Sequence, residues 1–327
     1  MSRPSVRPVV WSPPPIPERC RRTEGTAPFP PMRVIELDAT GPEDVVVDPA
    51  GWVVTGVDDG RVLRISPDGA EVQTLADTGG RPLGIELHPG GGLVVCDARR
   101  GLLHVSASGE VRDLVGGMQF CNNASVAADG TIYFTDSSRR FGLENFRADI
   151  LEHSGTGRLL RRSPDGRVEV LLEGLQFANG VALAADGRWV AVAQTGAYSV
   201  TRLWVSGPLA GTTEELVPNL PGFPDNIAFG EDGLLWVTLA SPRNPLVDRL
   251  ARFPLLRKVV WGLPDALQPA PEHTAWVIAV DTDGRVVHDL QGTHDRFHMV
   301  TGVRQHGDSL YLGSLVGNTI GVLSLTA

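Results

Sequence analysis

The sequence is poor in the residues that several kinds of chemistry require. Lys258 is the only lysine in 327 residues, so Schiff-base catalysis would depend on that one side chain. The three cysteines, Cys20, Cys96 and Cys121, show no CxxC spacing, and free thiols in a reducing compartment are the simplest interpretation. The sequence also contains no GxSxG, HExxH or phosphate-loop motif. A disulfide scaffold, a serine hydrolase and a zinc protease therefore have no support.

A long apolar run and a basic surface are missing as well. No stretch approaches the roughly eighteen apolar residues of a membrane span, and residues 1–22 contain prolines where a secretory signal needs an apolar segment. The formal net charge is −9, whereas a nucleic-acid partner favours a basic face. We therefore expect a cytoplasmic protein without a transmembrane segment and without a nucleic-acid partner. Nothing in the sequence predicts its oligomeric state.

What the sequence does contain is a repeat of short apolar strands separated by turns with Gly and Asp or Pro. Six copies follow one another, at 45–69, 85–109, 125–138 with 157–166, 181–207, 227–241 with 275–284, and 300–325. Many short antiparallel strands with a period of roughly 40–50 residues are typical of propeller blades. The pattern predicts an all-β fold, a six-bladed β-propeller spanning residues 33–327. Residues 33–38 precede the first copy and are expected to add the outer strand of the last blade, which closes the ring.

Three segments lie outside the repeat. Residues 1–32 are rich in proline and are expected to form an extended N-terminal arm. Residues 139–156 interrupt the third blade and residues 242–272 interrupt the fifth. Both insertions are predicted to contain short helices; in the fifth-blade insertion Asn244-Pro245 has the residues of a helix start, and Pro254 is expected to separate two helices. Such insertions either decorate the scaffold or cover the mouth of the tunnel.

The repeat also aligns a set of polar residues. Counting eight residues back from the glycine of each first hairpin turn reaches Glu43, Asn122, Asn179 and Asp225, with Asn226 beside it. Because the blades are related by rotation about one axis, these side chains are expected to meet at one end of the central tunnel. Any one of them is easily explained as a polar residue that begins a strand, but four in one register are not.

A hard cation satisfies such a ring. Buried carboxylates need a counter-charge, and Ca²⁺ accepts carboxylate and amide oxygens in flexible geometry. The set contains no Cys or His, which disfavours a thiolate or imidazole zinc site. Ca²⁺ is therefore the expected metal, with Mn²⁺, Mg²⁺ or Zn²⁺ as alternatives. In the other two blades the same count reaches Leu83 and the region of Thr301.

Several stretches around these residues are familiar, among them GRPLGIEL, DGTIYFTDSS, LEGLQFANGVALAADG and LPGFPDNIAFGEDGLLWV. Over residues 33–325 the chain resembles the SMP-30/gluconolactonase/paraoxonase-like superfamily of six-bladed propellers. Within it, the chain is most similar to the strictosidine synthase-like branch, which is related to the adipocyte plasma membrane-associated protein.

The resemblance implies a catalytic Ca²⁺ or another divalent ion on the tunnel axis. Metal-binding members of the superfamily have a glutamate at the position of Glu43, asparagines at Asn122 and Asn179, and an aspartate at Asp225. Paraoxonases add the asparagine that matches Asn226.

At two positions the chain differs from members of the superfamily, and each difference excludes one activity from what the resemblance implies. The paraoxonase histidine is replaced by Leu83, so the paraoxonase dyad is not implied. Strictosidine synthase depends on a glutamate near the start of the sixth inner strand, where this chain reads HDRFHMVTGV. A condensing activity of that kind is not implied either.

The resulting hypothesis is a metal-dependent hydrolase of lactones or related esters, with Asp225 as metal ligand and candidate base. His298 near the same rim is a second candidate for the base. The alternatives are a lyase, isomerase or condensing enzyme that reuses the metal site, and a binding protein without turnover.

The substrate is expected to be a hydrophobic small molecule. Five apolar residues of the loops and insertions are predicted to line the cavity: Leu83, Phe141, Phe146, Phe253 and Trp261.

Overall fold

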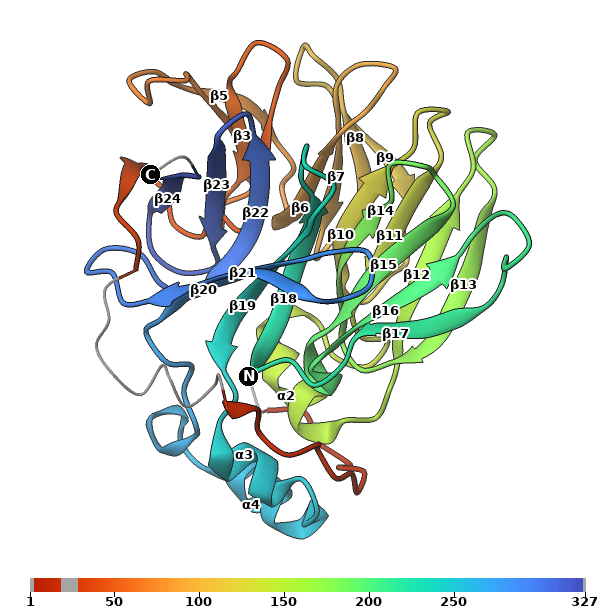
Figure 1. The fold of residues 1–327 in the computed structure, drawn as a ribbon, viewed down its shortest axis with the longest axis vertical. Helices are drawn as coiled ribbons and strands as arrows, with labels where there is room; N and C mark the ends of the chain where they lie inside the picture. Colours follow the sequence, from red (N-terminus) through yellow and green to blue (C-terminus); the bar gives the residue numbers. More distant parts are fainter. Residues whose placement is uncertain (1–2, 19–28, 326–327) are drawn as a thin grey trace.

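A computed structural model describes residues 3–18 and 29–325 of the chain. Its strands form six antiparallel sheets of four strands each, so the predicted six-bladed β-propeller is confirmed (Figure 1). Cys20 and residues 1–2 and 19–28 of the predicted arm lie outside the described residues. No helix in the described part of the chain is long and apolar enough to cross a membrane.

The blades follow one another along the chain, and the first strand of each lies innermost, beside the propeller axis. Blade 1 is β2 (Val45–Val47), β3 (Val53–Gly56), β4 (Arg61–Ile65) and β5 (Val72–Asp77); blade 2 is β6 (Pro82–Leu87), β7 (Leu93–Asp97), β8 (Gly101–Val105) and β9 (Val111–Val115). Blade 3 is β10 (Cys121–Val126), β11 (Ile132–Asp136), β12 (Gly157–Arg162) and β13 (Val168–Leu175). Blade 4 is β14 (Ala178–Leu183), β15 (Trp189–Gln194), β16 (Ser199–Trp204) and β17 (Thr213–Val217).

The last two blades complete the ring. Blade 5 is β18 (Gly222–Phe229), β19 (Leu235–Pro242), β20 (Ala275–Val280) and β21 (Val286–Gly292). Blade 6 is β22 (Val300–His306), β23 (Ser309–Ser314), β24 (Thr319–Ser324) and, from the other end of the chain, β1 (Met32–Glu36). β1 pairs antiparallel with β24, as the sequence predicted. This pairing joins the two ends of the propeller and covers the edge of blade 6.

The glycines used to align the blades mark a recurring tight turn. The N–H of Gly51 donates to the carbonyl of Asp48 at 2.8 Å, and Gly51 has a φ of +81°. The same turn ends at Gly130, Gly187 and Gly233, again with positive φ. Glycine adopts this conformation without strain, so the turn fixes the spacing between the first two strands of blades 1 to 5. That is why a count from the glycine identifies equivalent positions.

Close packing of the inner strands also requires glycine. A Cβ atom at Gly180 of β14 would lie 2.4 Å from the Ile227 nitrogen of β18. A Cβ atom at Gly302 of β22 would lie 2.7 Å from the Glu43 carbonyl oxygen. Neighbouring inner strands therefore touch backbone to backbone where the polar ring is found, and larger residues would push the blades apart.

Both predicted insertions contain helices. The insertion in blade 3 forms η1 (Leu143–Asn145) and α2 (Phe146–Glu152). The insertion in blade 5 forms α3 (Pro245–Leu250), α4 (Pro254–Gly262) and η3 (Asp265–Leu267). The side chain of Asn244 accepts hydrogen bonds from the first turn of α3, so the predicted helix start is confirmed. In Figure 1 α2, α3 and α4 lie together at one end of the propeller.

We expect the strand that closes the ring to carry measurable stability. Ile35 of β1 is buried and packs with Ile320 of blade 6 and with Val53 and Leu63 of blade 1. Ile35→Ala should lower the free energy of unfolding by about 2–4 kcal/mol, measured by urea denaturation. Val72→Ala, on the exposed outer strand β5, is the matched control and should cost less than about 1 kcal/mol. Equal losses for the two variants would contradict a closing role for β1.

Candidate metal centre and its cavity

The structure brings the predicted ligands together at one end of the tunnel. Glu43 precedes β2, Asn122 and Asn179 lie at the start of β10 and β14, and Asp225 and Asn226 lie in the middle of β18. The pairing register between first and second strand shifts around three of these positions: between Cys121 and Ala124, between Ala178 and Val181, and between Pro224 and Ile227. Such shifts mark β-bulges, which re-aim side chains. The bulges therefore turn Asn122, Asn179 and Asp225 out of the regular strand alternation.

Buried threonines fix the backbone of this ring. Thr301 donates to the carbonyl oxygen of Glu43 at 2.8 Å, and Thr135 donates to that of Asn179 at 2.7 Å. Thr238 donates to the carbonyl oxygen of Asn226 at 3.0 Å. The sequence analysis missed these supports. Thr55, Thr135 and Thr238 do occupy similar positions in the second strands of blades 1, 3 and 5, a pattern that could have revealed them.

The ring leaves acceptor oxygens buried without a hydrogen-bond donor. Asn226 donates to one oxygen of Glu43 at 3.1 Å, and Asn179 donates to the hydroxyl of Thr195 at 3.1 Å. Glu43 Oε2, Asn122 Oδ1, Asn179 Oδ1 and Asn226 Oδ1 are buried and accept no hydrogen bond. Since buried polar atoms are normally paired, four orphan oxygens in one place call for a cation.

The electrostatics of the centre point the same way. Burial raises the pKa of Glu43 well above its usual range, and the negative charges of Asp225 and Asp44 raise it further. Burial raises the pKa of Asp225 to about 7, against a hydrogen bond from Asn179 that acts to lower it. Both shifts mean that the charged forms are poorly compensated by the protein alone.

One buried cation near the ring escaped the sequence analysis. The charge of Arg81 acts to lower the pKa of Glu43. Its guanidinium donates to the carbonyl oxygens of Gly41 and Pro82, at 2.8 and 3.0 Å, so its hydrogen bonds go to backbone atoms. Arg81 thus supplies part of the counter-charge and leaves the four oxygens open.

The donor set suits a hard cation. Among the described residues there is no cluster of three or more His, Cys, Asp or Glu that would hold a metal. The ring has two such residues, Glu43 and Asp225, and its other three oxygens come from carboxamides. Oxygen-only sets with few charges are typical of Ca²⁺ sites and unlike those of structural zinc.

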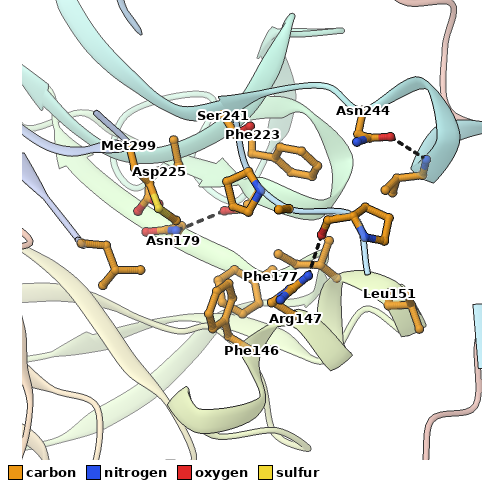
Figure 2. Close-up of a pocket in the computed structure, with 18 of the residues that line it drawn as sticks. Phe146, Arg147, Leu151, Phe177, Asn179, Phe223, Asp225, Ser241, Asn244 and Met299 are labelled. Carbon is orange, nitrogen blue, oxygen red and sulfur yellow. Dashed lines mark hydrogen bonds between the residues drawn. The ribbon is translucent and has the colours of Figure 1, made fainter. Parts of the chain in front are cut away.

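A cavity of about 170 Å³ opens onto the ring. Glu43, Asn122, Asn179 and Asp225 lie at its floor, and most of its remaining wall is apolar. Figure 2 shows Asn179 and Asp225 at one end, with Phe146, Phe177 and Phe223 along the walls. The cavity therefore joins a polar, anionic floor to an apolar chamber, which is the arrangement of many small-molecule sites.

The predicted apolar lining is partly right. Leu83, Phe146 and Trp261 line the cavity as expected. Phe141 does not, because it is buried in a separate cluster with Val6 and Ala148. Phe253 does not either, because it precedes α4 and is half exposed to solvent.

Three phenylalanines of the wall were not predicted: Phe120, Phe177 and Phe223. They lie just before or within the ligand-bearing inner strands, and Phe177 has a φ of +58°. This left-handed residue directly precedes β14, two positions before the ligand Asn179.

The second candidate base lies apart from this cavity. His298 is absent from the cavity lining, where its neighbour Met299 is found instead. The His298 ring stacks on His273 with 4.1 Å between ring centroids. Burial lowers the pKa of His298, and the neighbouring His273 lowers it further. The prediction that His298 acts as a base thus receives no support from the geometry, whereas Asp225 is at the cavity floor.

The two insertions form a cap over the cavity. Phe146, Arg147 and Ile150 of α2 and Val260 and Trp261 of α4 all line it. Arg147 donates to the carbonyl oxygen of Pro269 at 2.5 Å and so links the insertion of blade 3 to that of blade 5 (Figure 2). The insertions therefore act as a cover, one of the two roles left open by the sequence.

The N-terminal arm ties this cap together. The N–H of Val9 donates to the carbonyl of Glu152 at the end of α2, at 2.9 Å. Trp261 of α4 donates to the carbonyl of Pro4 at 2.8 Å. Arg257 of α4, itself buried, donates to the carbonyls of Leu151 and Val9. Residues 3–18 therefore contact both insertions and act as a strap across them.

Comparison with solved structures agrees with the fold. A gluconolactonase from Xanthomonas campestris superposes with a TM-score of 0.66 at 19% identity, covering 98% of this chain and 97% of that one. A calcium-binding protein, regucalcin, from Agrobacterium tumefaciens superposes with a TM-score of 0.64 at 12% identity, covering 90% and 94%. At these identities the likeness shows the fold alone.

Comparison of sequences gives the family. Residues 122–208 match the family model named Strictosidine synthase, and residues 31–65 match Strictosidine synthase-like, N-terminal. The chain is 35% identical over 289 residues to STRICTOSIDINE SYNTHASE-LIKE 6 of Arabidopsis thaliana, covering 84% of this chain and 76% of that protein. It is 33% identical over 328 residues to the adipocyte plasma membrane-associated protein of Homo sapiens, covering 90% and 78%. The predicted resemblance is confirmed, and the chain belongs to the strictosidine synthase-like family of six-bladed propellers.

Proposed function

We propose that this protein is a Ca²⁺-dependent hydrolase of hydrophobic lactones or related esters. The observation that carries the proposal is the set of four buried, donor-free oxygens, three of which belong to residues on the floor of an apolar cavity. Glu43, Asn122, Asn179, Asp225 and Asn226 would hold the ion. When bound, Ca²⁺ supplies a Lewis acid for the carbonyl group of an ester or lactone. The fold shared with a gluconolactonase and a calcium-binding regucalcin supports the proposal in general terms.

The residues of the chain have separable roles in this proposal. Asp225 is the one ligand residue that is only partly buried, so its carboxylate is accessible from the cavity. It is the candidate base that takes a proton from water at its carboxylate oxygen. Phe146, Phe177 and Phe223 provide apolar walls that hold the substrate and exclude bulk water. Thr135 and Thr301 position the ring and do not touch substrate.

Family membership alone would equally allow a condensing enzyme, a lyase or an isomerase. Met299, just before the sixth inner strand, lies in the cavity wall, and residues 294–303 contain no glutamate like the one that strictosidine synthase uses in this region. The missing glutamate favours hydrolysis over condensation, because the residue that reaches the cavity here, Met299, supplies no acid or base. Binding without turnover is the remaining alternative and is an outcome of the following test.

At saturating Ca²⁺, where the carboxamide oxygen still serves as a ligand, we expect Asp225→Asn to lower kcat/KM for lactone or aryl-ester hydrolysis by at least about 100-fold. Glu43→Gln should weaken Ca²⁺ binding itself, because it removes a ligand charge. The measurements are hydrolysis of a lactone and ester panel with EDTA and with Ca²⁺, and elemental analysis of each variant.

Asp44→Asn is the matched control for these variants. Asp44 is a buried carboxylate next to Glu43, but it is absent from the cavity lining and accepts hydrogen bonds from Ile85 and Asn123. Its substitution removes a negative charge that raises the pKa of Glu43 and of Asp225, so it should shift the pH profile of the reaction without abolishing it. Protein that binds Ca²⁺ but hydrolyses nothing on the panel would rule out the proposed activity and favour a binding function.

The stability of the metal-free protein should fall as pH rises from about 5 to about 8. The pKa of Asp225 is about 7 when folded against an ordinary value of 3.8, so the folded state holds more protons in this range. The unfolded state releases them, and stability is lost as pH approaches 7. Ca²⁺ binds the deprotonated ring, so its stabilising effect should be larger at the upper end of this range.

Thermal melts with EDTA and with CaCl₂ across this pH range measure the effect. Burial also raises the pKa values of Asp44 and Asp149, to about 6, so these two carboxyl groups add to the loss of stability in the lower half of the range. In the doubly substituted Glu43→Gln, Asp225→Asn protein the part of the pH slope above about pH 6 should largely disappear, because Asp44 and Asp149 titrate near pH 6. A melting temperature in EDTA that rises with pH, together with a Ca²⁺ shift independent of pH, would argue against a cation centre at the ring.

A further inference from the structure

The cap exposes an unusual concentration of large apolar side chains. Of the fourteen that are exposed in the described part of the chain, six lie within residues 246–267: Leu246, Phe253, Leu255, Leu256, Val259 and Leu267. The other eight are spread over the remaining described chain. Contiguous exposed apolar surface on a soluble fold marks a site of interaction, whereas scattered apolar residues do not.

Helix α4 exposes apolar side chains and buries a charged one, the opposite of an ordinary surface helix. Leu255 and Val259 are 76% and 61% exposed, while Arg257 is 3% exposed. With 3.6 residues per turn, Leu255, Leu256 and Val259 fall on the outer face, and Arg257 and Trp261 fall on the inner face. A surface helix normally turns its apolar face to the core and its charges to water. The outer face of α4 therefore lacks an apolar partner within the described chain.

The charge around this face is positive. Arg249, Arg252 and Lys258 are exposed and make no ion pair with a described residue. The acidic residues of the segment are already paired, since Asp248 is bound by Arg243 and Asp265 by Arg3. The patch is thus cationic on a chain whose net charge is −9, and the only lysine lies in it. Apolar side chains flanked by unpaired cations are typical of surfaces that lie on anionic lipid.

We propose that the outer cap face, formed by Leu255, Leu256 and Val259 with Arg249, Arg252 and Lys258 around them, docks on an anionic lipid surface. The apolar side chains enter the boundary between headgroups and acyl chains, and the three cations contact the headgroups. A second copy of the chain fits this face less well. A two-fold contact would place the same cationic patch against itself.

The outer cap face lies on the other side of α4 from the cavity, so docking would bring the cavity close to the lipid. Val260 and Trp261, on the inner side of α4, line the cavity above the metal centre. In Figure 1 α3 and α4 project from the end of the propeller, beyond the strands. A docked cap would hold the cavity beside the bilayer, so an apolar ester dissolved in lipid would have a short path to it. This consequence rests on the proposed function, whereas docking itself does not.

The test is flotation of the purified full-length protein with lipid vesicles. One set contains phosphatidylcholine alone, and in the other about a third of the lipid is phosphatidylglycerol. The doubly substituted Leu255→Ser, Val259→Ser protein should bind the anionic vesicles at least about tenfold more weakly than the wild type. The matched control is Val168→Ser with Val170→Ser, two exposed valines on the outer strand β13, which should bind as the wild type does.

Charge is tested separately by the triple variant Arg249→Gln, Arg252→Gln, Lys258→Gln. It should lose the preference for anionic over neutral vesicles, and added salt should have the same effect on the wild type. Melting temperature and Ca²⁺ content show whether each variant is folded. Because the substituted side chains point to solvent, both should stay close to wild-type values.

Three results would overturn the proposal. In the first, the wild-type protein does not float with the anionic vesicles. In the second, the Leu255→Ser, Val259→Ser protein floats as well as the wild type. In the third, light scattering shows a wild-type dimer that the same double substitution abolishes. The last result would assign the face to a second copy. Hydrolysis of a water-soluble ester by the same variants distinguishes the two proposals. If docking fails, hydrolysis of this ester is unchanged. If the proposed hydrolase activity fails, flotation with the vesicles is unchanged.

Discussion

The structure depends on one electrostatic constraint, the burial of unpaired acceptor oxygens at the propeller axis. Glu43 and Asp225 are held there with carboxamides that add oxygens and little counter-charge, and Arg81 compensates only in part. Desolvating these groups is unfavourable, and the surrounding backbone holds them in place against that cost. Bulges turn the side chains inward, and buried threonines hold the carbonyls behind them. A bound cation would convert this destabilising cluster into a stabilising one.

The same constraint explains why the register of the sequence was informative. The first five blades repeat a tight turn ending in glycine, and an equal count from that glycine reaches an equivalent place on the axis. The fold, the closing strand and the convergence of Glu43, Asn122, Asn179 and Asp225 could therefore be predicted. Counting residues within each blade does not predict the contacts between neighbouring blades. Thr301, which supports Glu43 from the neighbouring blade, and Arg81 come from such contacts and were missed.

The cavity walls were harder to predict, because they belong to segments outside the repeat. The periodicity of an insertion shows that a helix forms but does not fix which face it turns to the propeller. Phe146 and Trp261 were placed correctly, whereas Phe141 turns into a cluster with the arm and Phe253 turns to solvent. A shift of one residue likewise separates His298 from Met299, and only the latter reaches the cavity.

The inner and outer faces of the cap meet different requirements. Its inner side must be apolar enough to enclose an apolar chamber, yet α4 also turns Arg257 inward. That arginine is satisfied by the carbonyls of Leu151 and Val9 and so fastens α4 to α2 and to the arm. Because Arg257 occupies part of the inner side of α4, Leu255, Leu256 and Val259 lie on the outside, while Val260 and Trp261 line the cavity. A cap held by buried polar contacts does not need its outer face for folding, and that face is free to serve binding.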